Sequence, residues 1–253
     1  MPLLSQPIRI ISLVPSQTEL LIDLGLEQEL VGITKFCIHP DYLRRTKSII
    51  GGTKNFNFPL IDQLQPDLII GNKEENYKEG IEQLQEKYPV WISDITTLED
   101  ALAMISKVGE LTGKEIQASD LSDKISAAFQ NLTYQGHLIK VAYFIWQHPY
   151  MVAASHTFID DMLQRCGFLN VFKHLDRYPE ISEEQLAEAK PEFVFLSSEP
   201  YPFKEQHLLE FKQIYPEATV KLVDGELFSW YGSRLLHSPA YFKGLMNESI
   251  AKR

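Results

Sequence analysis

Cysteine is scarce in this chain of 253 residues, which contains two. Cys37 and Cys166 lie far apart in the sequence, in separate predicted lobes, so a disulfide framework is not expected. No paired Cys-x-x-Cys, HExxH or close His-x-His pattern occurs, so no metal-site motif can be recognised. Cys166 follows a predicted helix and precedes Gly167, which is typical of a small buried hydrophobe.

Positive charge and long apolar runs are also lacking. The chain has 24 Lys and Arg against 34 Asp and Glu, a net charge of −10, so binding to nucleic acid is not expected. The longest apolar stretches have the length of a strand, so no membrane span is expected. Met1–Pro7 has no basic region and runs straight into the first strand, which is unlike a secretory signal. We expect a cytoplasmic protein as the chain stands, and a periplasmic one if a leader was removed.

Catalytic motifs are absent as well. The chain has no Gly-x-Ser-x-Gly nucleophile elbow, no P-loop and no Gly-x-Gly-x-x-Gly after a strand. Its adjacent acids, Glu74-Glu75 and Asp160-Asp161, fit solvated surfaces better than a general acid/base pair. The sequence therefore predicts a protein that is not an enzyme.

What the chain does have is an internal repeat. Residues 61–71 indicate a short helix, a Pro-Asp step and a buried strand, and residues 182–196 indicate the same unit with two extra residues before the proline. Each half opens on an apolar strand, Ile8–Val14 and Leu138–Trp146. The repeat predicts an α/β fold of two similar lobes with mostly parallel sheets. A small ligand is then expected in the cleft between the lobes.

Local signals give the first lobe its elements. Pro15 ends the first strand, and Ser16 and Glu19 have the spacing of a capping box, which predicts Ser16 as the N-cap of a helix. Gly25 is placed to stop that helix, and a second strand is predicted at Leu30–Thr34.

A helical linker is expected between the lobes. Apolar residues recur at helical spacing from Thr97 to about Asn131, broken by Gly113, which predicts one or two helices. The predicted organisation is residues 1–97 as the N-terminal lobe, 98–133 as the linker and 134–253 as the C-terminal lobe.

The loops after the strands carry the candidate site, because ligands of open α/β sheets bind outside the carboxyl ends of the strands. Aromatic and hydrogen-bonding side chains are concentrated there, which suits a large, flat, partly apolar ligand. A single loop aromatic more often packs than binds. The run Phe228–Tyr231 is different, because three large aromatics beside a glycine and an arginine are hard to bury. The predicted ligand contacts are Lys35, Phe36, Cys37, His39, Asn55, Phe56, Asn72 and Glu75 from the first lobe, and Trp146, His148, Tyr150, His156, Tyr178, Ser229, Trp230, Tyr231 and Arg234 from the second.

Three segments carry a resemblance to a known family. Arg9-Ile-Ile-Ser-Leu-Val-Pro-Ser-Gln-Thr-Glu-Leu-Leu, then Leu30-Val-Gly-Ile-Thr, then Leu64-Gln-Pro-Asp-Leu-Ile-Ile resemble the class III substrate-binding proteins of ABC transporters. These are the helical-backbone receptors for cobalamin, ferric siderophores and haem, and the chain is most similar to the cobalamin-binding branch. The resemblance implies two α/β lobes joined by one long linker helix, with the ligand held between them.

The same resemblance implies ligand and partner. It implies a cobalt or iron chelate as solute, no intrinsic cofactor, and an ABC permease dimer as partner. As an extension of this hypothesis, we expect His148, His156 or Cys37 to be an axial donor to the metal of the chelate. Receptors of this family dock through one acid per lobe, at the start of matching helices. Glu184, beside Glu183, matches in the second lobe, whereas the first lobe has Pro59 there and no acid until Asp62.

Three alternatives stay open at this point. The first is a cytoplasmic scavenger or sensor of the same ligand. The second is an enzyme that processes a metal tetrapyrrole on this scaffold, and the third is an interaction module. In the last case Phe56, Phe58 and Trp230 would themselves fill the cleft.

Overall fold

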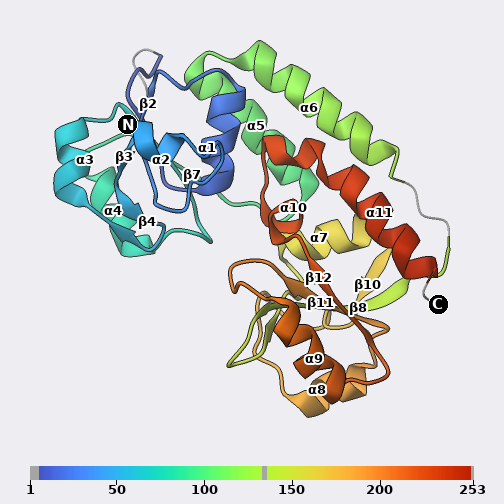
Figure 1. Cartoon of the computed structure of the whole chain (residues 1–253). Coiled ribbons are helices and arrows are strands. Elements are labelled where there is room, and N and C mark those ends of the chain that lie inside the picture. The colour runs from blue at the N-terminus through green and yellow to red at the C-terminus, as the bar shows by residue number, and fades with distance from the viewer. Residues whose placement is uncertain (1–5, 133–135, 252–253) are drawn as a thin grey trace. The chain divides into compact units, whose positions relative to one another are not determined.

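The computed structural model describes residues 6–132 and 136–251 and divides them into two compact units (Figure 1). Unit 1 consists of the chain up to Ile95, Glu99–Ile125 and Tyr231–Arg234; unit 2 consists of Thr96–Leu98, Ser126–Trp230 and the chain from Leu235. The predicted boundary between linker and second lobe, at residues 133 and 134, lies outside the described residues, as does most of Met1–Pro7.

Unit 1 is built on a parallel sheet with the strand order β3-β2-β1-β6-β7. The central strand has its residues fully buried, as an apolar run covered on both faces requires. A two-stranded antiparallel hairpin, β4–β5, follows β3. The strands are β1 Ile10–Ser12, β2 Leu30–Ile33, β3 Ser48–Ile49, β4 Gly51–Gly52, β5 Asn55–Phe56, β6 Leu68–Asn72 and β7 Val90–Ser93.

The helices before the linker are α1 Pro15–Asp23, α2 Leu43–Thr46, α3 Phe58–Leu64 and α4 Lys78–Gln85. The prediction that Ser16 caps α1 is wrong: the N-cap is Val14, without a side-chain cap. Pro15 takes the first helical position, where its missing N–H is no loss, so the helix begins one residue earlier. Gly25 follows the helix with φ +79, a conformation that favours glycine, which confirms the predicted stop.

The linker segment forms two helices, α5 Leu98–Thr112 and α6 Glu115–Gln130. The periodicity prediction of one or two helices is confirmed, and α6 runs from unit 1 into unit 2. Gly113, with φ +69, separates the helices, and Gly109 lets α6 approach closely: a Cβ at Gly109 would lie 2.5 Å from that of Ala118. The division between the two units falls within α6, after Ile125.

Unit 2 has a second parallel sheet, in the order β10-β8-β11-β12, with β9 pairing antiparallel to β8. Its strands are β8 Ile139–Trp146, β9 Met151–Val152, β10 Phe168–Asn170, β11 Phe193–Ser197 and β12 Thr219–Val223. Its helices are α7 Phe158–Arg165, α8 Glu183–Ala189, α9 Glu205–Ile214, α10 Gly225–Ser229 and α11 Ser238–Ala251, with a 3-10 helix at Ser233–Leu236. None of the helices in the described parts of the chain is long and apolar enough to cross a membrane.

The internal repeat corresponds to α3–β6 in unit 1 and α8–β11 in unit 2. Both helices end in a left-handed residue directly before the proline, Gln65 with φ 44 and Lys190 with φ 46. Ile61 and Leu186 are each buried five residues before that proline. The two helices have 7 residues each, so the prediction of two extra residues in the second is wrong.

The acid after the proline has the same role in both units. The Asp67 carboxylate accepts hydrogen bonds from the N–H groups of Ile8 and Arg9, at 2.8 and 2.9 Å. Glu192 Oε1 accepts one from the N–H of Lys140, at 3.0 Å. Each acid therefore holds the chain at the start of the first strand of its own sheet.

Candidate functional site

In unit 1 the loop after β2 presents an aromatic side chain to solvent. Phe36 is 49% exposed, and the Lys35 Nζ lies 5.0 Å from the centre of its ring. Gly52 in the β4–β5 hairpin leaves room for the side chains of Phe36 and Lys35. A Cβ at this position would lie 3.1 Å from the Phe36 ring and 3.4 Å from Lys35 Cε. The hairpin thus supports Phe36 as an exposed platform.

Cys37 and His39 follow in the same loop. The Cys37 side chain is fully buried, with its Sγ 3.0 Å from Thr18 Oγ1 and 3.3 Å from Thr34 Oγ1. Burial raises the pKa of the Cys37 thiol, which disfavours the thiolate that binds metals. His39 is half-buried.

The loop after β6 is held by Asn72. Its side chain is buried; its Oδ1 accepts from the N–H groups of Glu74 and Glu75, and its Nδ2 donates to the carbonyl oxygen and Oγ of Ser93. Asn76 Nδ2 in turn donates to the carbonyl oxygens of Leu13 and Thr53. Asn72 therefore sets the position of Glu75 and joins the ends of β6 and β7.

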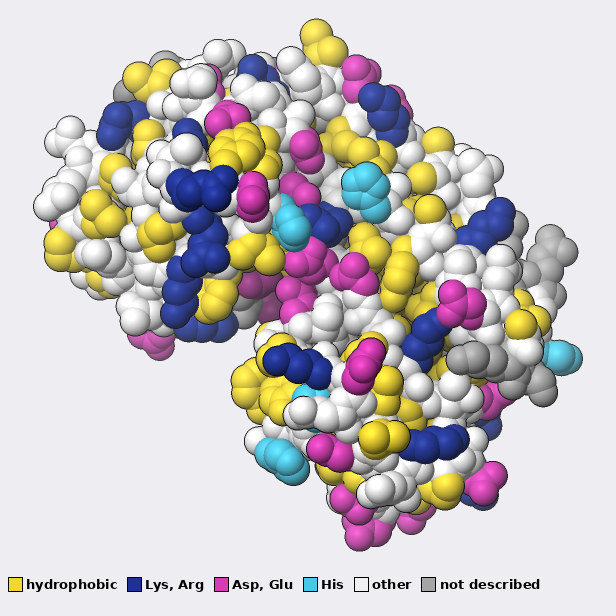
Figure 2. All heavy atoms as spheres, viewed as in Figure 1, with side chains coloured by type: hydrophobic (Ala, Val, Ile, Leu, Met, Phe, Trp, Pro, Cys, Tyr) yellow, Lys and Arg dark blue, Asp and Glu magenta, His cyan; other side chains and the backbone are white. Residues whose placement is uncertain are grey.

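Three exposed lysines come from the loops after strands of unit 1: Lys35, Lys54 and Lys73. Lys54 Nζ donates to the carbonyl oxygen of Glu74 at 2.7 Å, and Lys73 forms an exposed ion pair with Asp94. Figure 2 shows Lys and Arg side chains gathered in a band over unit 1. This is notable in a chain whose net charge is −10.

The hairpin residues differ from each other in exposure. Asn55 is exposed, whereas Phe56 is 6% exposed and packs on the rings of Tyr77 and Phe58, with centroid distances of 4.8 and 6.2 Å.

In unit 2 the end of β8 presents a second exposed aromatic. Trp146 is 39% exposed and makes an edge contact with Tyr201, with the ring centroids 5.4 Å apart. The exposed ring of His148 lies 6.0 Å from the half-buried ring of Tyr150, which packs on the buried Phe211 at 5.4 Å. Trp146, His148 and Tyr150 therefore all lie where β8 ends and the chain turns toward β9.

A second loop pair of unit 2 contains His156 and Tyr178. His156 Nδ1 lies 2.8 Å from Asp176 Oδ1, and Arg177 Nη1 donates to the His156 carbonyl oxygen at 3.1 Å. The Arg177 guanidinium lies 6.0 Å from the centre of the Tyr178 ring. The two predicted residues therefore lie on neighbouring loops, joined by Arg177.

The three aromatics in the segment from Phe228 to Arg234 are buried, contrary to expectation. Phe228 is fully buried against Phe242 and Tyr143, at centroid distances of 4.6 and 5.1 Å, and Trp230 and Tyr231 are 6% and 5% exposed. The prediction that these aromatics are hard to bury is wrong, because aromatic residues of β8 and α11 surround Phe228.

Two acids that the sequence interpretation missed hold this segment. Glu199 Oε1 accepts hydrogen bonds from Ser229 Oγ at 2.6 Å and from Trp230 Nε1 at 2.8 Å. Glu19 in α1 forms a bidentate ion pair with Arg234: the Arg234 Nη2 and Nε lie 2.7 and 2.8 Å from the two carboxylate oxygens. Glu19 was interpreted as part of a capping box, and no local pattern signals a partner 215 residues away.

We expect Glu199→Gln to stabilise the protein at neutral pH. Burial raises the pKa of Glu199, and the nearby Glu226 and Asp224 raise it further, while the Ser229 and Trp230 hydrogen bonds oppose the rise. The pKa of this carboxyl is near 4.5 in the unfolded chain and higher in the folded protein. The group therefore contributes its full stability below pH 4.5, and this contribution is lost as the pH rises through the folded-state pKa. Glutamine keeps an acceptor for both donors and carries no charge.

Thermal melts between pH 4 and pH 8 measure this. The gain in melting temperature for Glu199→Gln should grow as pH rises above about 4.5. Exposed Glu188→Gln is the control and should show no such trend. A loss of stability at pH 7 in Glu199→Gln would contradict the prediction.

The structure places the predicted contacts in two groups. Unit 1 contains Lys35, Phe36, Cys37, His39, Asn55, Phe56, Asn72, Glu75, Tyr231 and Arg234, and unit 2 contains Trp146, His148, Tyr150, His156, Tyr178, Ser229 and Trp230. Within residues 6–132 and 136–251, no three His, Cys, Asp or Glu side chains come together as a metal site.

The chain belongs to the periplasmic binding protein family, which matches residues 10–213. The vitamin B12-binding protein of Photorhabdus laumondii is 28% identical over 200 residues, covering 77% of this chain and 72% of that protein. The predicted class III membership, near the cobalamin-binding branch, and the role of a solute-binding protein are thereby confirmed.

Solved structures confirm the fold class of two α/β lobes. The periplasmic vitamin B12 binding protein BtuF of Vibrio cholerae has a TM-score of 0.83 at 20% identity, covering 96% of this chain and 98% of its own. The periplasmic haem binding protein HutB of the same organism has a TM-score of 0.81 at 21% identity, covering 94% and 98%.

Proposed function

We propose that this chain binds a metal chelate with anionic groups at its periphery, a corrinoid or a ferric chelate such as haem, for uptake by an ABC permease. The observation that carries the proposal is the exposure of one large aromatic in each unit at the carboxyl ends of the parallel strands: Phe36 on the loop after β2, and Trp146 as the last residue of β8. Exposed aromatic platforms suit a flat macrocycle. The relatives that bind vitamin B12 and haem support this ligand class.

The lysines of unit 1 support an anionic periphery. Lys35, Lys54 and Lys73 are exposed on three loops at one end of the sheet. The propionates of haem, the phosphodiester of a corrinoid and the carboxylates of many siderophores are groups that such lysines attract. Two further points stay predictions. The first is that the loops of both units contact one solute, and the second is that His148 or His156 provides an axial ligand to its metal.

The proposed partner is an ABC permease, contacted through the start of α8. Glu183 and Glu184 are exposed in its first turn, and a hydrogen bond from the Ser182 hydroxyl lowers the pKa of Glu184. At the equivalent place in α3 stands the exposed Pro59. Asp62 on that helix instead accepts a hydrogen bond from the Tyr88 hydroxyl and forms an ion pair with Lys87. A location outside the cytoplasmic membrane belongs to this proposal.

Titration of the purified protein with cyanocobalamin, haem and a ferric hydroxamate siderophore tests the ligand. Quenching of tryptophan fluorescence, with Trp146→Leu as a site variant, measures the affinity for each. We expect submicromolar binding of one of the three that weakens at least tenfold in Trp146→Leu. Failure of all three to bind at micromolar concentrations would overturn the proposed function.

The role of the lysines has its own test. We expect the triple variant Lys35→Gln, Lys54→Gln, Lys73→Gln to bind the chelate roughly 10- to 100-fold more weakly, since three exposed ion contacts contribute about 0.5–1 kcal/mol each. The control replaces three exposed lysines elsewhere, Lys78, Lys124 and Lys243, which changes the net charge by the same amount. Equal losses in the two variants would show that only the overall charge matters.

A further inference from the structure

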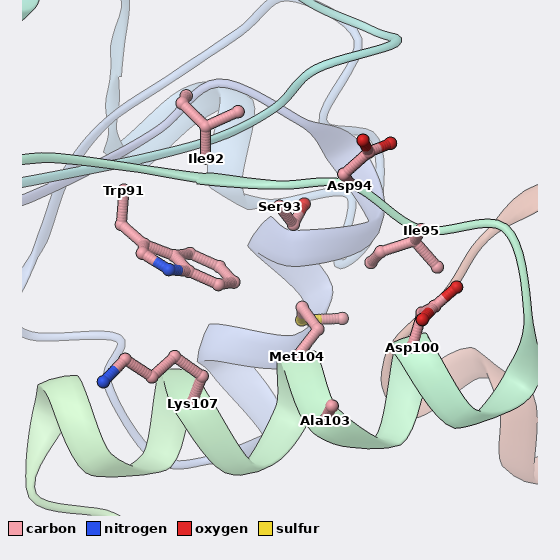
Figure 3. A pocket seen from close by; sticks show the side chains of 9 residues that line it. All are labelled: Trp91, Ile92, Ser93, Asp94, Ile95, Asp100, Ala103, Met104 and Lys107. Carbon is pink, nitrogen blue, oxygen red and sulfur yellow. The ribbon is translucent and has the colours of Figure 1, made fainter.

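Unit 1 contains a groove that the loops described above do not line. It has a volume of about 280 Å³ and lies between β7 and α5 (Figure 3). Asp100, Ala103, Met104 and Lys107 line it from α5, at the spacing of one helix face, and Trp91 lines it from β7. The groove is smaller than the 300–1,000 Å³ typical of pockets for drug-sized molecules, so it fits something smaller than a corrinoid or haem.

The floor of the groove is apolar. The Trp91 indole lies over α5, next to the Met104 thioether, as Figure 3 shows. Met104 is buried, whereas Ala103 is exposed and leaves the space open because its side chain is a single methyl group. A ligand therefore meets apolar side chains between the charged residues of the groove.

The two ends of the groove carry opposite charges. Asp94 and Asp100 lie at the end where β7 finishes, and Lys107 lies at the other end, beside Trp91 (Figure 3). Asp100 and Lys107 are seven residues apart on α5, which separates them by about 10 Å along the helix. The charge pattern complements a molecule with an ammonium group and a carboxylate about that far apart.

The strand beside the groove has an open edge. β7 is the last strand of its sheet, paired with β6 on one side only. The carbonyl oxygens of Pro89 and Ser93 accept from the N–H groups of Ile69 and Lys73 in the direction of β6, at 2.9 Å each. The alternation of a parallel pair then turns the N–H and C=O of Ile92, a residue that lines the groove, to the outer edge.

We propose that this groove binds a short peptide of about three residues with both termini free, extended and antiparallel to β7. Three extended residues span about 10 Å, which matches the rise of α5 from Asp100 to Lys107. The peptide ammonium lies at Asp94 and Asp100, its carboxylate at Lys107, and its middle residue hydrogen bonds to Ile92. The ion pairs Lys73–Asp94 and Lys107–Glu110 are exposed, so their exchange for peptide contacts costs little.

Calorimetric titration with Ala-Leu-Ala tests the proposal in the whole chain. We expect saturable binding that weakens at least tenfold when the peptide is N-acetylated, and at least tenfold when it is C-amidated. Ala103→Phe fills the groove and should abolish the binding. Ala127→Phe, the same change at an exposed position of α6 outside the groove, should leave it unchanged.

Several outcomes would overturn the proposal. They are no heat of binding up to millimolar peptide, equal binding of the blocked peptides, equal binding of free leucine, or unchanged binding in Ala103→Phe. Circular dichroism and the melting temperature establish that the two phenylalanine variants are folded, since both positions are exposed on helices.

Discussion

Replacing Arg234 with leucine is expected to lower the free energy of unfolding by about 3 kcal/mol. Arg234 and Glu19 are only 14% and 18% exposed, and the guanidinium binds both carboxylate oxygens. Removing Arg234 takes the guanidinium away from the largely buried Glu19 carboxylate, which is the costly step. The loss should appear as a lower midpoint in urea denaturation followed by circular dichroism.

A double-mutant cycle separates the pair from its surroundings. Glu19→Leu alone should cost a similar amount, whereas Glu19→Leu combined with Arg234→Leu should recover much of the loss, because neither variant side chain is charged. If the two single losses simply add in the double variant, the ion pair is not their cause. Gly232, with φ +120, lies beside the backbone of Ser16, so the same pair also anchors a close backbone contact.

Phe211→Ala is expected to destabilise unit 2 by about 4 kcal/mol. Phe211 on α9 is fully buried and packs on Phe144, Tyr150 and Phe203, with centroid distances of 4.8, 5.4 and 5.9 Å. Truncation removes a large buried apolar side chain, so the free energy gained by burying it is lost. It also leaves a cavity that the surrounding rigid rings fill poorly.

The same helix provides the control for this variant. Leu209 is 70% exposed, so Leu209→Ala should change the free energy of unfolding by less than about 0.5 kcal/mol. Both are measured by urea denaturation, as above. Comparable losses in the two variants would show that the helix, and not the buried ring, sets the stability. Because Tyr150 rests on Phe211, chelate binding should also weaken in Phe211→Ala under conditions where it is folded.

The fold was predictable from the sequence to a large extent. Near-continuous apolar runs at residues 8–14 and 139–146 indicated strands covered on both faces, and β1 and β8 lie there. The repeated helix-proline-strand unit was visible because its parts are neighbours in the chain. The start of α1 was misplaced because Pro15 and Ser16 offer competing local signals, and the position of Pro15 in the first turn prevailed.

The candidate site was predictable only in part. Phe36 and Trp146, predicted as ligand contacts where strands end, are exposed, whereas Phe228, Trp230 and Tyr231, which were expected to resist burial, are buried. These aromatic side chains look alike in the sequence. Their exposure differs because distant residues cover one set and leave the other open.

The sequence by itself determined the class of fold and the loops in which binding residues would be found, because apolar periodicity and turn residues act over a few positions. Only the tertiary structure decided which loop side chains face solvent and which acids hold the others. Glu19 meets Arg234 across 215 residues and Glu199 meets Trp230 across 31. Such pairs depend on how the chain closes on itself, and no local pattern encodes that closure.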